Sequence, residues 1–246
     1  MPNNVTNRFT VSGAPDDVGR FFAAIDGGAD EKGQPLYIDF NRIKPMPEAL
    51  AGIKAGSDTD RALDYYVLRQ IEKHGAPAVM MALGDYGGGA VYRRLPETLA
   101  RRRHNLDAGD MPELLKLGEQ CFGNIRAYGA PTWYEWRNQN WGTKWNAYGQ
   151  ERIDDDTLQF YTANAGVPEL LRGLSAQFPD LTMSYAYADD DWGNNAGEYR
   201  FNGGEVDYEF LPEDGSQGAR RIAEELLGPL ETEDEGEDGW ELGDDD

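Results

Sequence analysis

The sequence predicts an α+β fold, and three features of its 246 residues lead to that prediction. Short segments in which polar and apolar residues alternate, as in a half-buried strand, lie towards both ends of the chain. Other segments repeat apolar residues every three or four positions, as an amphipathic helix does. The stretch at about 48–125 loses the strand alternation and carries helix signals. We therefore expect one domain, residues 1–228, that contains a helical insertion at about 48–125.

The first elements predict a strand, a helix and a second strand. Residues 7–12 (NRFTVS) alternate in polarity, which is typical of a half-buried strand. A helix should begin near Pro15, because proline and the aspartates after it suit a first helical turn. Residues 36–40 (LYIDF) predict the next strand, and Pro45 and Pro47 end it, since proline cannot donate to a ladder. This order predicts a βαβ unit.

The second half of the chain predicts five further strands and two helices. A hairpin should turn at the aspartates 154–156, and a second turn lies at residues 189–195. The expected strands are residues 144–150, 157–161, 182–188, 197–202 and 206–210, and the expected helices begin at Pro168 and after the capping residue Ser216.

The last residues, 229–246, are acidic and rich in glycine, and we expect a disordered tail. Residues 231–246 hold ten carboxylates and no basic residue. Only Trp240 and Leu242 offer apolar surface, which is too little to offset the entropy lost on ordering. The tail should therefore not contribute to the stability of the domain.

A chain truncated at Gly228 should melt at nearly the same temperature as the full chain. Differential scanning calorimetry of the two proteins measures this directly. A cooperative loss of structure in the truncated chain would contradict the expectation, and it would indicate that Trp240 or Leu242 packs on the domain.

The charge balance restricts the possible partners. The formal net charge is −22, from 45 acidic and 23 basic residues. Such a protein repels bare nucleic acid and anionic membranes. The sequence also lacks the run of about 18 apolar residues that crosses a membrane, and its first residues lack the features of a signal peptide. We expect a cytoplasmic protein that does not bind membranes or nucleic acid directly.

Residues for common catalytic sites are scarce. Cys121 is the single cysteine, and His74 and His104 are the two histidines, so a Cys/His zinc site cannot form within one chain. Cys121 lies on an apolar helical face, which is typical of a buried thiol. We therefore expect no catalytic residues, no cofactor and no metal site, and we do not expect an enzyme.

The stretch 131–148 (PTWYEWRNQNWGTKWNAY) contains four of the six tryptophans. Aromatic rings beside cations could stack nucleobases or hold a partner side chain. Tryptophan also buries a large area, so the same residues could form the main core. We favour the second interpretation, which places in a structural aromatic core the residues Trp133, Trp136, Trp141 and Trp145.

Two aspartate triplets, 154–156 and 189–191, lie at predicted turns where side chains should project into solvent. They are candidate partner-binding residues: Asp154, Asp155, Asp156, Asp189, Asp190 and Asp191. The second turn also carries oxygen ligands as far as Glu198, so a metal-dependent enzyme is an alternative. It does not match the EF-hand pattern, because Asn194 occupies the glycine position and Arg200 the twelfth position. A turn closed by Asp and Asn side chains is the simpler interpretation.

Four motifs lie within residues 7–210: NRFTVSG, YIDFNRIKPMPE, WYEWRNQNWGTKWNAY and LSAQFPDLTMSYAYADDDWGNNAGEY. Together they resemble plasmid- and phage-encoded proteins with a YubB-type ferredoxin-like domain. The resemblance implies a βαββαβ antiparallel core with inserted helices, and a protein encoded by a mobile element. It implies no activity, so there are no catalytic residues to carry over. The tail lies outside the matching part.

These observations favour a non-enzymatic acidic interaction protein of a phage or plasmid. Carboxylates spaced over a rigid surface could replace nucleic-acid phosphates against a basic host protein that itself binds nucleic acid, of the restriction or CRISPR type. Acidity that only keeps the protein soluble explains the charge equally well. The alternative from another class is a nucleic-acid-handling protein that uses the Trp-rich stretch as a stacking platform.

Overall fold

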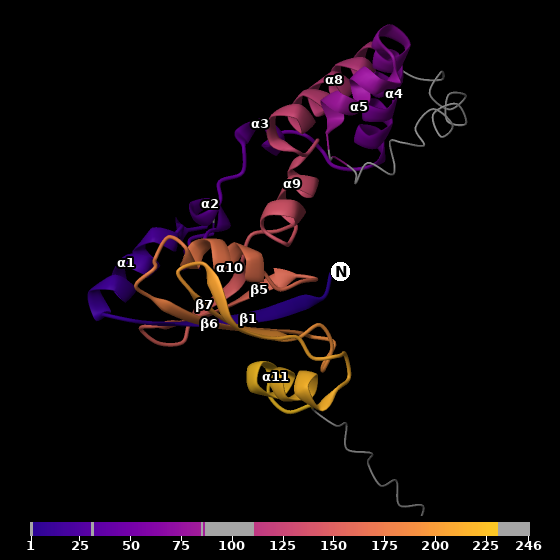
Figure 1. The fold of residues 1–246 in the computed structure, drawn as a ribbon. Helices are drawn as coiled ribbons and strands as arrows, with labels where there is room; N and C mark the ends of the chain where they lie inside the picture. Colours follow the sequence, from indigo (N-terminus) through magenta and orange to yellow (C-terminus); the bar gives the residue numbers. More distant parts are fainter. Residues whose placement is uncertain (1, 31, 85, 87–110, 231–246) are drawn as a thin grey trace, which may run out of the picture.

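The computed structural model describes residues 2–30, 32–84, 86 and 111–230, and it shows an α+β fold around a six-stranded antiparallel sheet (Figure 1). The sequence-predicted tail from residue 231 onward, and residues 87–110 of the predicted insertion, lie outside the described residues. No helix in the described part has the length and apolar character needed to cross a membrane.

The sheet has the strand order β4-β5-β1-β6-β7-β8, and every pair of neighbours is antiparallel. Its first four strands follow the chain order β1, α1, β4, β5, α10, β6, which is the βαββαβ order of a ferredoxin-like fold. Strands β7 and β8 extend the sheet beyond β6. The strands are β1 (Asn4–Ser12), β4 (Tyr148–Arg152), β5 (Thr157–Ala163), β6 (Thr182–Asp189), β7 (Gly197–Asn202) and β8 (Glu205–Phe210).

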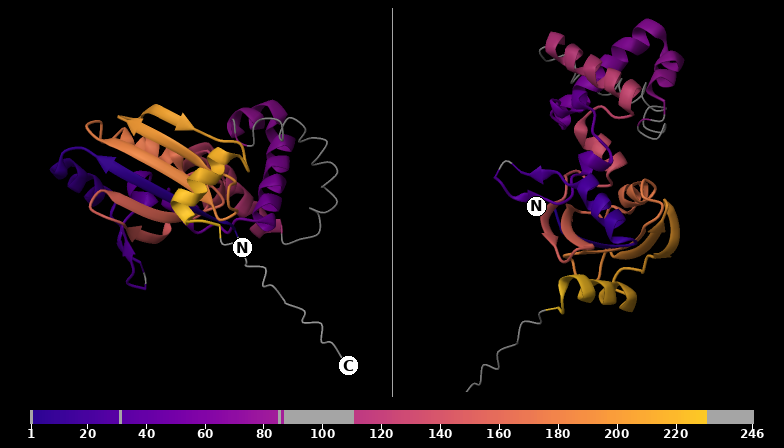
Figure 2. Two further views of the ribbon diagram at one scale, coloured as in Figure 1. Left: turned by 90° about the horizontal axis from the view of Figure 1, so that it is seen from below. Right: turned by 90° about the vertical axis from the view of Figure 1, so that its left-hand side faces the viewer.

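Helices lie on both faces of the sheet, but unequally (Figure 2). Helices α1 (Pro15–Ile25) and α10 (Pro168–Ser175) cover one face with their apolar sides. The other face carries α11 (Gln217–Leu227), whose first turn is capped by Ser216 as predicted, since the Ser216 hydroxyl accepts from the Ala219 amide. Alanines of the sheet, Ala186 and Ala188, let α11 approach closely. We call the part of this face that no helix of the described residues covers the open face (Figure 2).

The main core lies between the sheet and the pair α1 and α10. Alternation along β1 turns Phe9 and Val11 into this core, where both are almost completely buried. Phe9 packs edge-on against Phe21 at 5.8 Å between ring centroids. The helix period of α1 and the strand period of β1 thus bring their apolar residues to one interface.

A buried hydrogen-bond network crosses this core. Asn7 is fully buried, and its amide nitrogen donates to the Thr162 hydroxyl at 2.8 Å. The Tyr185 hydroxyl donates to the Asn7 carbonyl oxygen at 2.7 Å and accepts from the Val167 amide at 2.8 Å. These partners satisfy the buried polar groups. Burial raises the pKa of Tyr185 well above its ordinary value, so the phenol stays protonated.

The predicted strand at residues 36–40 is wrong. Only Leu36 of this segment belongs to a strand, β3 (Pro35–Leu36), which pairs with β2 (Gly28–Ala29) in a small separate hairpin. The short helix α2 (Phe40–Ile43) follows, because the Asp39 carboxylate accepts from the Asn41 amide and caps the helix. The second core strand is β4 instead. The strand prediction fails because the amides of residues 38–40 donate to side chains and to the Ile25 carbonyl of α1 instead of to a neighbouring strand.

The side chains of Asn146 and Gln150 make the side-chain hydrogen bonds to residues 38–40. The Asn146 carbonyl oxygen accepts from the Phe40 amide at 2.9 Å, and the Asn146 amide nitrogen donates to Asp39 at 2.8 Å. Gln150 accepts from the Ile38 amide at 2.8 Å and donates to the Ile38 carbonyl at 2.9 Å. The segment around Asp39 is therefore fixed without a sheet ladder.

The insertion forms a helical unit with its own core. Helices α4 (Ser57–His74), α5 (Ala76–Leu83) and α8 (Met111–Tyr128) pack together, and the unit stands away from the sheet (Figure 1, Figure 2). The short α3 (Glu48–Ala51) leads into it and α9 (Trp133–Asn140) leads back. Among the described residues, its core shares no buried residue with the core of the sheet and consists of Ile53, Leu63, Val67, Val79, Leu83, Cys121 and Ile125.

Candidate functional site

The open face of the sheet contains a hollow beside the C-terminal end of α11. The strand registers put Thr10 of β1, Ser184 of β6 and Arg200 of β7 in one cross-strand row, which Tyr208 of β8 completes. Side chains of directly paired residues lie next to each other on one face. Because Thr10 and Ser184 are small, the row is low at its β1 and β6 end and higher at Arg200 and Tyr208.

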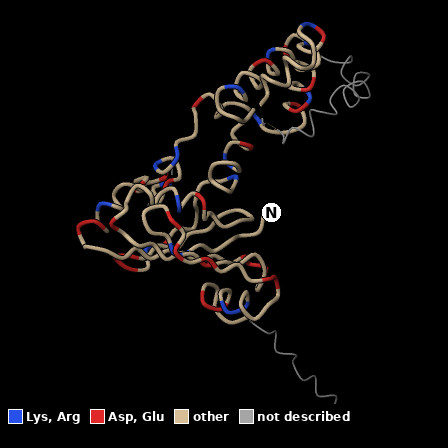
Figure 3. The backbone as a smooth tube through the Cα atoms, viewed as in Figure 1, with Lys and Arg blue, Asp and Glu red and all other residues tan. Residues whose placement is uncertain are grey.

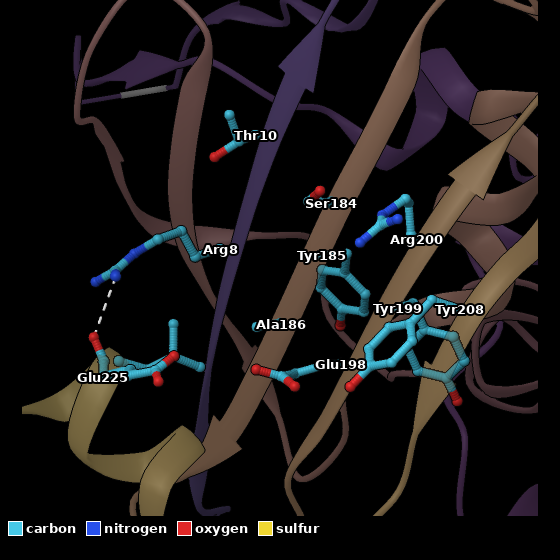
Figure 4. Close-up of a pocket in the computed structure, with 11 residues that line it drawn as sticks. Arg8, Thr10, Ser184, Tyr185, Ala186, Glu198, Tyr199, Arg200, Tyr208 and Glu225 are labelled. Carbon is cyan, nitrogen blue, oxygen red and sulfur yellow. Dashed lines mark hydrogen bonds between the residues drawn. The ribbon is translucent and has the colours of Figure 1, made fainter.

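The hollow has a volume of about 400 Å³ (Figure 4). Arg8 and Arg200 stand on opposite sides of it, with Ser184 between them. A second cross-strand row, Arg8, Ala186 and Glu198, runs beside the first. The end of α11 contributes to the wall. The lining residues are Arg8, Thr10, Ser184, Tyr185, Ala186, Glu198, Tyr199, Arg200, Tyr208, Glu225 and Leu226.

The two carboxylates of the hollow are already paired. Arg221 of α11 donates to both oxygens of Glu198, at 3.0 and 2.7 Å, and to Glu225 at 2.9 Å. The hydrogen bonds that Arg221 donates to Glu198 and, to a smaller extent, to Glu225 raise the pKa of Arg221. Together with Arg8 and Arg200, the site has three guanidinium groups against two carboxylates. It is therefore locally cationic in a chain of net charge −22.

Arg8 is held in place by protein groups. Its guanidinium donates to the Gln159 side chain at 3.0 and 2.6 Å and to the Glu225 backbone carbonyl at 3.1 Å. The last of these bonds is drawn in Figure 4. Arg8 therefore joins β1, β5 and α11 and presents a fixed positive charge at the rim of the hollow.

Arg200 has a different environment. Among the described residues, Arg200 forms no hydrogen bond or salt bridge. Its guanidinium makes a cation–π contact with the Tyr208 ring, at 5.9 Å from the ring centroid. The Tyr208 side chain is itself 43% exposed. A guanidinium without an acceptor beside an open aromatic ring can bind an anion and a planar group together.

The Trp-rich stretch is divided between core and surface. Trp136 and Trp141 are buried, at 5% and 1% exposed, and the Trp141 indole nitrogen donates to the Lys44 carbonyl at 2.9 Å. The Arg137 guanidinium lies over the rings of Trp133 and Trp141, at 5.1 and 4.8 Å. Burial lowers the pKa of Arg137, and the nearby carboxylate of Asp39 acts against this effect.

The placement of Trp145 in the core is wrong, because its side chain is 41% exposed. The Lys144 ammonium lies over its ring at 4.8 Å, and Tyr148 packs edge-on against it at 6.2 Å. Tyr148 in turn lies beside Tyr161 at 6.0 Å. Between Trp141 and β4 the chain alternates between buried and exposed positions, and Trp145 falls at an exposed position between the buried Thr143 and Ala147.

Asp189 does not project into solvent as expected. Its side chain is buried and accepts from the Asn3 amide nitrogen at 2.9 Å and the Asn195 amide nitrogen at 3.0 Å. The Asp191 backbone amide is a third donor at 3.0 Å. Burial raises the pKa of Asp189, but these hydrogen bonds outweigh it and the net pKa is lowered. This aspartate closes the turn, whereas Asp190 and Asp191 are exposed.

The other triplet forms the turn between β4 and β5. Arg152 donates to the backbone carbonyls of Asp154 and Asp155, and the side chains of these two aspartates are exposed. Hydrogen bonding with the Asp156 side chain lowers the pKa of Asp154, and the Asp156 backbone amide, which donates to the Asp154 carboxylate, lowers it further. The Asp156 carboxylate accepts from the Thr157 hydroxyl at 2.8 Å.

The structure does not bring the two triplets together. Thr157, next to the first triplet, pairs with Thr10 near the end of β1, whereas Asp189 pairs with Val5 near its beginning. The triplets therefore lie at opposite ends of the sheet. A partner bound at one end of the sheet therefore contacts one triplet and not the other.

The remaining candidate ligands and nucleophiles are dispersed in the described part of the chain, which holds no group of three His, Cys, Asp or Glu residues that could bind a metal. Glu198, at the end of the proposed metal turn, is bound by Arg221 instead. Cys121 is buried in the insertion, and burial raises its pKa to about 11. His74 ends α4, and His104 lies outside the described residues.

Comparison with known proteins identifies the kind of domain. The family model described as the ferredoxin-like domain in Api92-like protein matches residues 140–236, which include β4 to β8, α10 and α11. Among solved structures, the crystal structure of the protein Api92 from Yersinia pseudotuberculosis is similar, with a TM-score of 0.42 and 13% sequence identity, over 88% of this chain and 100% of that chain. No curated protein matches the sequence.

Proposed function

We propose that this chain is a non-enzymatic interaction protein whose carboxylates take the place of nucleic-acid phosphates against a basic partner. The observation that carries the proposal is a concentration of carboxylates at the end of the sheet where β1 ends. We call this surface the acidic end. It consists of Asp16 and Asp17 at the start of α1, Asp154 and Asp155 in the β4–β5 turn, Asp180 before β6, and Glu205 at the start of β8.

The strand registers place these segments together. Ser12, after which α1 begins, pairs with Thr182, and Thr182 pairs with Asn202 next to the turn that leads to Glu205. The Val11 amide donates to the Asp156 carbonyl at 2.9 Å, which brings the β4–β5 turn to the same end. Figure 3 shows acidic residues at this end of the sheet, at the left of the view.

Few cations neutralise the acidic end. Of its six carboxylates, Asp17 alone forms a salt bridge to another described residue, Arg20. Arg152 is nearby, but it donates to backbone carbonyls and lies over the Phe22 ring at 3.4 Å. Carboxylates on turns of a rigid sheet hold fixed positions, as phosphates of a duplex do. A basic partner groove would therefore find preorganised contacts and a strong attraction at long range.

The resemblance to plasmid- and phage-encoded proteins indicates the class of partner. A mobile element benefits from blocking a host protein that binds nucleic acid, and restriction and CRISPR proteins have the required basic grooves. The proposal therefore names a basic, nucleic-acid-binding host defence protein as the partner. Charge supports it, since the chain as a whole is acidic and the described cations near the acidic end are engaged.

The test is a competition experiment. The partner is first isolated by pull-down from a host lysate, and labelled duplex is then bound to it and displaced with this protein in a mobility-shift assay. Displacement is expected, and raising the salt from low to physiological concentration should weaken the complex at least about tenfold, because the Debye length shortens to about 8 Å.

Matched variants locate the contact. Changing Asp16, Asp154, Asp155 and Asp180 to Asn should abolish displacement. The control variant removes the same number of charges from exposed carboxylates of the insertion, by changing Asp58 to Asn and Glu48, Glu113 and Glu119 to Gln. It should displace duplex as the parent does. If duplex and protein bind the partner together, or if both variants behave alike, the proposal is wrong.

One observation favours a second function, a stacking platform for nucleic acid. Trp145 is exposed beside Lys144, its ring packs against Tyr148, and Tyr148 packs against Tyr161, so the three rings form a row. Aromatic rings with a nearby cation can stack bases of a single strand. In that case this protein would shift labelled RNA or DNA without any partner, and Trp145→Ala would remove the shift.

A further inference from the structure

We propose that the hollow on the open sheet face binds a nucleoside monophosphate. Its phosphate would lie among Ser184, Thr10 and Arg200, and its base would stack on Tyr208. The inference depends on the hollow alone and not on the acidic end, so either proposal can fail without the other.

The phosphate side follows from the donors in the first cross-strand row. The Ser184 hydroxyl has no hydrogen-bond partner among the described residues, and its side chain is exposed in the hollow. Arg200, directly paired with Ser184, has five N–H groups without an acceptor. A phosphate between them would accept from a fork of guanidinium donors and a hydroxyl, which is a strong charge-assisted arrangement.

Arg8 sets the charge of the site from the other side. Its position is fixed by Gln159 and Glu225, so it adds positive potential without moving. The carboxylates of Glu198 and Glu225 would repel an anion, but Arg221 pairs with both. The local excess of positive charge therefore favours an anion although the chain as a whole is acidic.

The base side follows from Tyr208 and from the spacing of strands. Tyr208 lies on β8, next to Arg200 and two strands away from Ser184, so the ring and the hydroxyl are separated by about 10 Å. This separation suits a ligand with a phosphate at one end and a planar ring at the other. The volume of about 400 Å³ lies in the lower range of small-molecule sites.

The net charge favours a free nucleotide over a strand. A polynucleotide would bring many phosphates close to a chain of charge −22, and only those near the hollow would meet cations. A mononucleotide places its charge at the cationic site, and the distant carboxylates are screened within about 8 Å at physiological ionic strength. The size of the hollow also accommodates one nucleotide unit.

The test is calorimetric titration of the full chain with adenosine 5′-monophosphate, adenosine and inorganic phosphate, combined with amide NMR shifts. The nucleotide should bind at least about tenfold more tightly than either part, because both ends contribute. Amide shifts should concentrate at Ser184, Arg200 and Tyr208. Equal binding of the nucleotide and phosphate, or shifts that concentrate elsewhere, would overturn the proposal.

Variants separate the two ends. Arg200→Gln should weaken nucleotide and phosphate binding at least about fivefold, whereas Tyr208→Val should weaken the nucleotide and leave phosphate unchanged. The control is Arg220→Gln on α11, an exposed arginine outside the hollow, which should have no effect. All three residues are on the surface, and circular dichroism verifies the fold. If Arg220→Gln weakens nucleotide binding as much as Arg200→Gln does, the proposed site is wrong.

Titration with a single-stranded oligonucleotide of about 12 residues distinguishes a free mononucleotide from a nucleic-acid strand as the ligand. Binding weaker than that of the mononucleotide supports a free nucleotide as ligand. Tighter binding that is lost in Arg200→Gln would show that the hollow takes a strand, and it would overturn the assignment to a mononucleotide.

Discussion

Replacing Trp141 with alanine should lower the free energy of unfolding by about 3–5 kcal/mol. The side chain is 1% exposed and packs edge-on against Phe40 at 5.6 Å and Trp136 at 5.9 Å. The variant loses this packing and leaves a cavity. It also leaves the Lys44 carbonyl without its indole donor and removes one of the two rings next to Arg137. Loss of a partner by a buried polar group adds to the cost.

Trp145→Ala is the matched control, because it removes the same side chain four residues later from the surface. We expect a change within about 1 kcal/mol, since little buried area is lost. Urea denaturation of both variants, followed by circular dichroism, gives the comparison. If Trp141→Ala unfolds like the parent, then Trp141 is not part of the core on which the sheet depends, and the assignment fails.

The sequence predicted most sheet strands because their two faces differ in polarity. Strands β5 to β8 follow the expected segments closely, and the capping of α11 by Ser216 is as predicted. Residues 36–40 show the limit of this reasoning. Their alternation is real, but the amides of Ile38 and Phe40 are bound by side chains of Gln150 and Asn146. Alternation alone does not show whether the backbone amides of a segment bond to a neighbouring strand or to side chains.

The candidate site could not be predicted in the same way. Arg8 and Thr10 alternate with core residues of β1, so their exposure on one face follows from the sequence. Their position beside Ser184 and Arg200 depends on the registers of two other strands. Those registers are fixed by turns and packing between residues far apart in the chain. Sequence reasoning therefore missed the hollow, although each member lies at a predictable strand position.

The aspartates show a related limit. A run of three acids at a turn predicts exposed carboxylates, and this holds for Asp190 and Asp191. Asp189 differs because Asn3, from the other end of the chain, and Asn195 both donate to it. A carboxylate that accepts several hydrogen bonds is stabilised as a structural anion. The partner from residue 3 could not be inferred from the local pattern.

Gly118→Ala should destabilise the helical insertion by about 3 kcal/mol. Gly118 lies on α8 where it meets α4, and a Cβ atom there would overlap the Ala62 carbonyl oxygen and come within 2.6 Å of the Tyr66 Cβ. Both obstacles are backbone or Cβ atoms, so no rotamer change relieves them. The helices would have to separate, which opens the core that contains Cys121 and Val67. The gain of about 1 kcal/mol in helix propensity is smaller than this cost.

Gly123→Ala on the same helix is the control, because nothing lies within 4 Å of a Cβ atom there. It should stabilise the insertion by up to about 1 kcal/mol, since alanine favours the helix. Amide hydrogen exchange separates the effects: in Gly118→Ala, exchange should rise in α4 and α8 and remain unchanged in β1 and β6, because the two cores share no buried residue. Faster exchange throughout the sheet would instead show that the insertion and the sheet unfold as one cooperative unit.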